Sequence, residues 1–131
     1  FLRMGYQQKE HVVAKGQAKH QTYVDALNLL GKDLARRAKS KCELSGEPGT
    51  LEIVDLEGSD VEPALEHVVM VSEEVAGYLN GRTVSGGSVR YLETSVWSTE
   101  PAIRRAAIRI LEHIDEPWAL EAIDNAKSMD G

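Results

Sequence analysis

The residues that most suggest chemistry form a short turn, Cys42-Glu43-Leu44-Ser45-Gly46. In a C-x-x-C-G turn two thiolates bind one zinc ion, and the glycine lets the backbone bend around the metal. Here a serine holds the second position. The place for a second cysteine pair is the stretch that follows a β-branched run and opens a helix, where Ser72 and Val75 stand. The chain therefore has the frame of a four-cysteine zinc site with a single cysteine in it.

Three of the four ligand positions hold residues that are unsuited to zinc. A neutral serine hydroxyl is a poor zinc ligand, and a valine side chain is none. Structural zinc contributes on the order of 10 kcal/mol to the folding of small fingers. We therefore expect no metal and no other cofactor, with Val75 joining the packed core that replaces the metal. A route in which His67 and Glu73 join Cys42 leaves the site one ligand short.

Other candidate sites are weaker. None of the four histidines has a metal-ligand spacing such as H-x-x-x-H. Cys42 and His67 could form a nucleophile pair in space, but a buried small side chain is the expected role of the cysteine. Residues 81–88 lack the spacing of a phosphate-binding loop. Trp97 and Trp118 could stack a base or another flat ligand, but each stands at an expected helix start, where we expect it to anchor the core. The sequence favours a protein that is not an enzyme.

Charge is distributed unevenly along the chain, whose formal net charge is −6. Residues 1–41 hold nine Lys or Arg against three acidic residues, whereas residues 42–81 hold ten Asp or Glu and no Lys or Arg. The simplest interpretation packs the acidic middle beside the basic first helix. The alternative is that one of these two surfaces binds a charged partner.

A nucleic-acid-binding function would use the basic end of the first helix. The candidate residues are Lys32, Arg36, Arg37, Lys39 and Lys41, joined by Arg104, Arg105 and Arg109. A structural role competes for the first group, because positive charge at a helix C-terminus complements the helix dipole. The overall acidity argues against nucleic acid, since phosphate neutralisation needs a continuous basic surface.

Hydrophobic spacing predicts the elements that must position these residues. Apolar residues at spacings of three and four predict an amphipathic helix over residues 22–38. Short apolar runs predict strands at residues 51–56 and 67–71. Ser72 is the expected N-cap of a short helix, because serine caps well and two glutamates follow in the first turn. A glycine-rich loop is expected at residues 80–88.

Two further helices are expected in the last third of the chain. Ser98 or Thr99 caps the first, with Pro101 in its first turn, and Asp115 caps the second, with Pro117 near its first position. The short link between them predicts a helical hairpin. The apolar stripe of the first helix is Ala102, Ile103, Ala106, Ala107, Ile110, Leu111 and Ile114. Its three arginines lie off that stripe.

The order of these features resembles the N-terminal zinc-ribbon region of the bacterial PhnA-like family, which is named from alkylphosphonate-utilisation operons. The matching segments are Lys41-Cys42-Glu43-Leu44-Ser45-Gly46, Ser95-Val96-Trp97-Ser98 with Pro101, and Trp118-Ala119. The resemblance spans roughly residues 22–127, and the family's separate C-terminal β-domain has no counterpart in this sequence. The resemblance implies a fold and four ligand positions, three of which have lost their cysteine. It implies no established reaction, substrate or cofactor.

These observations predict an α+β fold that is predominantly α. Helices pack on a small antiparallel β-hairpin, which is a degenerate zinc ribbon, and the last two helices form a hairpin. Residues 1–20 are expected to form a polar arm, and residues 21–131 a single globular domain.

The preferred function is a non-catalytic interaction module. Its expected partner is an unidentified protein or a second copy of this chain in a homo-oligomer. The alternatives are a nucleic-acid-binding protein and a small-molecule-binding protein or cryptic enzyme. No apolar run is long enough for a membrane span, and the N-terminus lacks the apolar stretch of a signal peptide. The lone cysteine excludes an internal disulfide, so we expect a cytoplasmic location without membrane contact.

Overall fold

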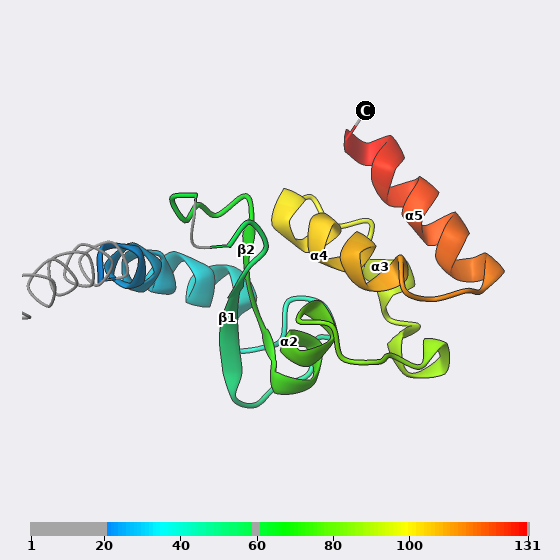
Figure 1. Cartoon of the computed structure of the whole chain (residues 1–131), viewed down its shortest axis with the longest axis horizontal. Coiled ribbons are helices and arrows are strands. Elements are labelled where there is room, and N and C mark those ends of the chain that lie inside the picture. The colour runs from blue at the N-terminus through cyan, green and yellow to red at the C-terminus, as the bar shows by residue number, and fades with distance from the viewer. Residues whose placement is uncertain (1–20, 59–60, 131) are drawn as a thin grey trace, which may run out of the picture.

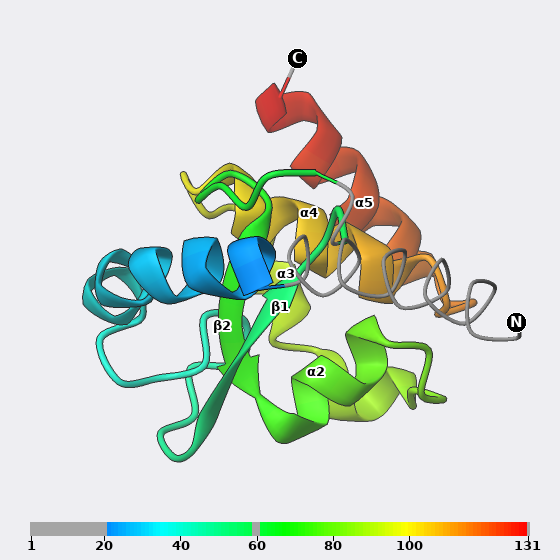
Figure 2. The same cartoon turned by 60° about the vertical axis from the view of Figure 1, so that its left-hand side comes forward.

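The computed structural model describes residues 21–58 and 61–130, so the expected polar arm at residues 1–20 lies outside the described residues. A two-stranded antiparallel sheet stands between a long helix on one face and a group of helices on the other (Figures 1 and 2). The fold is α+β and predominantly α, as expected. None of the helices in these two ranges combines the length and the apolar character that a membrane crossing requires.

The long helix covers residues 21–38 and packs on the sheet through the end of its apolar stripe. Leu34 and Ala38 are buried there, whereas the earlier apolar members of the stripe are only half-buried. The helix ends where Lys39 and Ser40 adopt a left-handed backbone, with φ of 55° and 65°. The amphipathic helix predicted from the sequence is confirmed.

The sheet consists of β1 (Leu51–Asp55) and β2 (Val68–Ser72), which pair so that the first residue of each lies opposite the last residue of the other. Side chains alternate between the two faces of a strand. Val69 and Val71 belong to the main core, which lies on the face opposite the long helix. Val68 is also fully buried but lies outside that core cluster, on the face that the long helix covers. The two predicted strands are confirmed.

Helix α2 (Glu73–Leu79) follows β2 directly, and the predicted cap is confirmed: Ser72 Oγ accepts a hydrogen bond from the backbone N of Val75 at 3.3 Å. Two short helical segments come next, η1 (Gly86–Val89) and α3 (Leu92–Ser95). Neither segment is predicted from the sequence, and η1 begins inside the glycine-rich loop expected at residues 80–88.

The chain ends in the expected helical hairpin, formed by α4 (Pro101–Leu111) and α5 (Pro117–Asp130). The expected caps of α4, Ser98 and Thr99, are wrong, because Glu100 occupies the N-cap position and makes no side-chain cap. Ser98 instead stabilises the approach to the helix: its Oγ accepts from the backbone N of Glu100 at 3.1 Å.

The predicted apolar stripe of α4 is buried in full, together with Ile114 just beyond the helix. One expectation about this helix is wrong. Arg104, which was placed off the stripe, is only 7% exposed. Its Nη1 donates to the backbone O of Ser98 at 2.8 Å, so the guanidinium is satisfied while the aliphatic stem is covered.

Candidate functional site

The structure brings together the four positions to which the sequence analysis assigned zinc ligands. The knuckle loop (residues 42–46) is closed by a hydrogen bond from the backbone N of Gly46 to the backbone O of Cys42 at 2.9 Å, and the glycine has a φ of 78°. Ser45, Ser72 and Val75 line a single cavity of about 390 Å³. Cys42 is 2% exposed, and its Sγ lies 3.4 Å from the backbone N of Ser45.

Hydrogen-bond donors surround the thiol of Cys42. Burial raises the pKa of this thiol, but hydrogen bonds from the Ser45 hydroxyl and from the backbone N–H groups of Ser45, Ser72 and Leu44 outweigh burial, so the pKa is lowered overall. Donors of this kind stabilise a thiolate. The loop therefore keeps the polar environment that suits a negatively charged sulfur.

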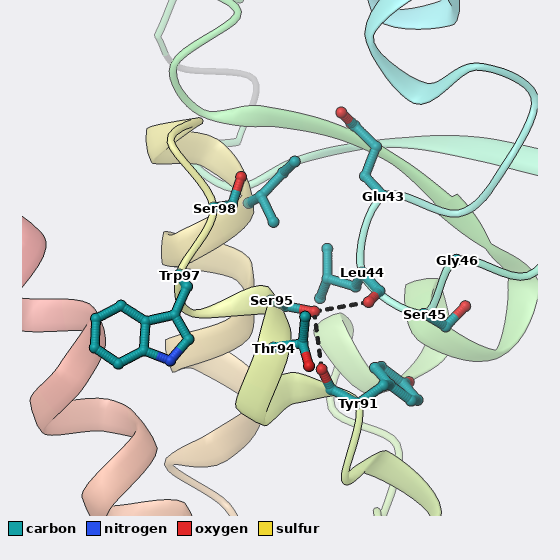
Figure 3. A pocket seen from close by; sticks show the side chains of 10 residues that line it. Glu43, Leu44, Ser45, Gly46, Tyr91, Thr94, Ser95, Trp97 and Ser98 are labelled. Atoms are coloured by element: carbon teal, nitrogen blue, oxygen red, sulfur yellow. Dashed lines mark hydrogen bonds between the residues drawn. The ribbon is translucent and has the colours of Figure 1, made fainter.

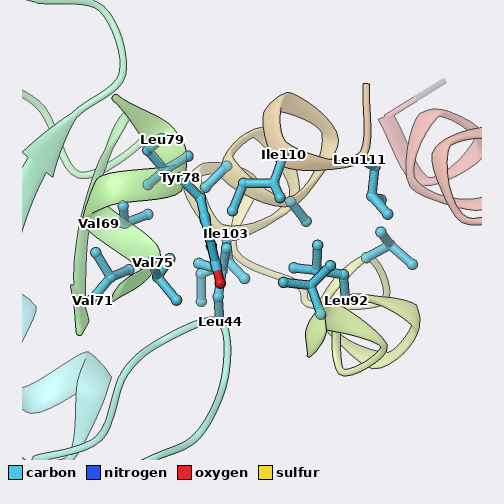
Figure 4. Close-up of a cluster of buried hydrophobic side chains, with 14 of the residues drawn as sticks. Leu44, Val69, Val71, Val75, Tyr78, Leu79, Leu92, Ile103, Ile110 and Leu111 are labelled. Carbon is cyan, nitrogen blue, oxygen red and sulfur yellow. The ribbon is translucent and has the colours of Figure 1, made fainter. Parts of the chain in front are cut away.

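Ser45 donates to the Cys42 thiol, and the two remaining positions are used for capping and packing. The Ser72 hydroxyl caps α2, and Val75 is 1% exposed. Figure 4 shows Val75 within the core cluster, beside Val71, as expected from the sequence. Among the described residues, no three His, Cys, Asp or Glu side chains group as a metal site requires.

His67 takes part in a different cluster, which the sequence analysis did not foresee. Its Nδ1 lies 3.0 Å from Asp55 Oδ1, and the other carboxylate oxygen of Asp55 accepts from the Tyr23 hydroxyl at 2.7 Å. Burial first, and then the hydrogen bond and the charge of Asp55, raise the pKa of Tyr23 to about 12. This cluster ties the long helix to the end of the hairpin.

The nucleophile pair considered from the sequence is not formed. His67 precedes the start of β2, whereas the cysteine contacts Ser72, the last residue of that strand. Five residues of extended chain span roughly 16 Å. His67 is therefore too far from Cys42 to act as its base or to join it in a metal site.

Arg37 does not contribute to the expected basic surface, because its guanidinium is directed into the molecule. It binds both carboxylate oxygens of Glu43 and donates to the backbone O of Leu65 and of Val68. Its side chain is 13% exposed, and that of Glu43 is 1% exposed. The remaining candidates of the first helix are exposed: Lys32, Arg36, Lys39 and Lys41.

The three arginines of α4 also bind backbone carbonyl groups. Arg105 donates to the backbone O of Glu66 at 3.0 Å, and Arg109 donates to the backbone O of Leu56 at 2.6 Å. Arg104 is buried, as described above. Arg105 and Arg109 thereby hold the β-hairpin and its connection against α4, and Arg105 remains exposed.

A groove of about 630 Å³ runs between the knuckle loop and residues 91–98 (Figure 3). One wall is joined to the other by Ser95, whose Oγ donates to the backbone O of Leu44 at 2.7 Å. Tyr91 points toward the knuckle loop, and its buried hydroxyl has no hydrogen-bond partner in the described part of the chain. The groove is open and is formed from two segments far apart in the sequence.

Trp97 lies at the edge of this groove and is 53% exposed. The expectation that Trp97 anchors the core is therefore wrong. The residue stands in the turn between α3 and α4, and its indole is directed away from the knuckle loop, on the side of α5 (Figure 3). Trp118, by contrast, is half-buried against the core. The Trp-Ser string before a proline shows the position of the turn in the sequence, but it carries no signal for the direction of the ring.

A second, smaller cavity of about 160 Å³ adjoins Trp97 and is called the indole pocket below. Its lining residues are Glu93, Trp97, Trp118, Glu121, Ala122 and Asn125. Next to it, the Arg90 guanidinium lies 4.6 Å from the centroid of the Trp118 ring and 2.6 Å from a carboxylate oxygen of Glu93. The groove and the indole pocket share one lining residue, Trp97.

Comparison with known proteins gives no relative: no protein-family model matches the chain, and no curated protein and no solved structure shows significant similarity to it.

Proposed function

We propose that this domain is a non-catalytic interaction module that binds a protein partner through the groove and Trp97. The observation that carries the proposal is the exposure of Trp97, 53% of whose surface is accessible at the junction of two hollows. Tryptophan is enriched among the residues that dominate binding energy at protein interfaces. A large apolar side chain at the edge of a groove supports a docking role more directly than a structural one.

The groove is suited to holding an extended segment of a partner. It is walled by the knuckle loop on one side and by residues 91–98 on the other, and the hydrogen bond from Ser95 to Leu44 fixes one wall against the other. A preformed site loses little conformational entropy on binding. The groove and the Trp97 indole together therefore favour binding of a partner segment to a preformed site.

The proposal includes descent from a PhnA-like zinc-ribbon region. It is supported by the convergence of Cys42, Ser45, Ser72 and Val75 around one thiol with a lowered pKa. Such a fold can persist without the metal when packing and hydrogen bonds replace the coordination bonds. A reducing cytoplasmic location is part of the proposal and agrees with the free thiol of the buried cysteine.

A photo-crosslinking amino acid at Thr94, an exposed residue of the groove, tests the proposed function in cells. We expect a discrete adduct that is lost when Trp97 is also replaced by alanine. The matched control places the same cross-linker at Leu29, which is 81% exposed on the long helix. The mass of the adduct distinguishes a second copy of this chain from another protein. Equal adducts at the two positions, or adducts insensitive to Trp97→Ala, would contradict the proposal.

A further inference from the structure

The indole pocket has the composition of a site for a cation. Two tryptophans contribute aromatic surface, and Glu93 and Glu121 contribute carboxylates. The face of an indole ring attracts cations through its quadrupole, and an adjacent carboxylate adds a charge-assisted hydrogen bond. The volume of about 160 Å³ is below the 300–1,000 Å³ that is typical of small-molecule pockets. It suits the head group of a side chain better than a whole metabolite.

An arginine of the same chain already makes both kinds of contact, with an indole and with a carboxylate, beside the indole pocket. Arg90 stacks on Trp118 and pairs with Glu93, yet it is not among the residues that line the pocket. One indole and one carboxylate are thus engaged by an arginine of the same chain. The second indole, Trp97, and the second carboxylate, Glu121, have no such arginine within the described residues.

We propose that the indole pocket binds the guanidinium group of an arginine in a basic segment of a partner protein. The inference rests on the proposed function and specifies the class of partner. Trp97 lines both the pocket and the groove, so an arginine seated between Trp97 and Glu121 would leave the rest of its segment along the groove. A planar guanidinium matches an indole face and a carboxylate better than a lysine ammonium does.

Charge complementarity selects a basic protein segment as the occupant. The chain carries a formal net charge of −6, and both ionisable groups of the pocket are acidic. Glu93 is already paired with Arg90, so Glu121 carries the selection: it would repel a nucleic-acid phosphate and attract an arginine. The salt dependence of binding should be modest, because the stacking contribution is not screened as the ion pair is.

The test uses the fluorescence of the chain, which has two tryptophans. The purified protein is titrated with a short peptide that has one central arginine, and with a matched peptide in which citrulline replaces the arginine. Citrulline keeps the shape of the side chain and removes its charge. We expect a saturable change in emission with the arginine peptide and about two- to fivefold weaker binding of the citrulline peptide, from the worth of an exposed cation–π contact.

Two variants assign the response to the pocket. In Trp97→Phe the remaining fluorophore, Trp118, also lines the pocket, and its emission should require a higher peptide concentration for half-saturation than the wild type does. Glu121→Gln is nearly isosteric at an exposed position and should weaken the arginine peptide about two- to fivefold without affecting the melting temperature. Asp124→Asn, at an exposed neighbour on α5 outside the pocket lining, is the control and should have no effect.

Equal responses to the arginine and citrulline peptides, no saturable response, or saturable binding of an oligonucleotide in place of the peptide would each overturn the inference. The failure of the proposed function is distinguishable from these outcomes. A cross-linked adduct at Thr94 that depends on Trp97 would keep the interaction module and reject only the arginine-containing partner.

Discussion

Replacing Arg37 by alanine should leave a buried carboxylate without its cation. The guanidinium Nε and Nη2 lie 2.5 and 2.9 Å from the two carboxylate oxygens of Glu43, in a bidentate pair. Nη1 and Nη2 also donate to the backbone O of Leu65 and of Val68, at 3.0 and 2.7 Å. The same arginine thus connects the long helix, the knuckle loop and the start of β2.

The structure indicates a large cost for this substitution. The Glu43 side chain is 1% exposed in the wild type, and the backbone N of Met70, which donates to it at 2.8 Å, would remain when Arg37 is removed. Removing one partner of a buried ion pair typically costs about 3–5 kcal/mol, because the remaining charge is left uncompensated. A domain of this size has a total stability of about 5–15 kcal/mol, so the variant should be close to the limit of folding.

Urea denaturation of the wild type and of Arg37→Ala, followed by far-UV circular dichroism, measures the loss. Arg36→Ala is the matched control. Its side chain is 78% exposed and, among the residues that the structure describes, pairs only with Asp33 on the same helix, so we expect a change below about 0.5 kcal/mol. Replacing Arg37 and Glu43 together by methionine and leucine should recover most of the loss. A loss below about 1 kcal/mol for Arg37→Ala would refute the assignment of this pair as a structural clamp.

Three further predictions concern the knuckle, the core and the cluster at the end of the hairpin. The triple variant Ser45→Cys, Ser72→Cys, Val75→Cys should bind one zinc ion per chain in elemental analysis, because these three positions converge on Cys42. A folded triple variant that binds no zinc would show that the four positions do not converge. Val75→Ala should lower the free energy of unfolding by about 1–3 kcal/mol in urea denaturation, because it opens a cavity at a residue that is 1% exposed, and an unchanged midpoint would contradict this. Tyr23 has a folded-state pKa raised to about 12, above its unfolded value near 10, so its stabilising contribution is complete below about pH 10 and is lost as the pH rises through about 12. The difference in free energy of unfolding between the wild type and Tyr23→Phe should therefore shrink over that pH range. A difference that stays constant with pH would exclude the hydrogen bond to Asp55 as the source of the stabilisation by Tyr23.

Features set by local chemistry could be predicted from the sequence. The cap at Ser72 depends on residues within one helical turn, and the apolar stripe of α4 depends on spacing within one helix. The burial of Cys42 and Val75 also followed from their place in a knuckle frame whose metal had to be replaced by packing. In each case, neighbours in the sequence decide the outcome.

Features set by distant segments could not be predicted. Arg36 and Arg37 are adjacent and identical in type, yet one side chain is 78% exposed and the other 13%, because only Arg37 faces Glu43 across the sheet edge. The direction of Trp97 depends on α3, whose four residues are too few to show a helical period. The groove likewise needs two segments that are far apart in the sequence, as in the hydrogen bond from Ser95 to Leu44, 51 residues away.

The most direct test of a metal-free interaction module is the metal content of the purified protein, combined with its thermal melt with and without a strong chelator. Packing by Val75 and hydrogen bonds to the Cys42 sulfur predict no stoichiometric metal and the same melting temperature in both conditions. One zinc ion per chain, together with a melting temperature that the chelator lowers, would contradict the account and would mean that the thiol of Cys42 coordinates a metal with other ligands.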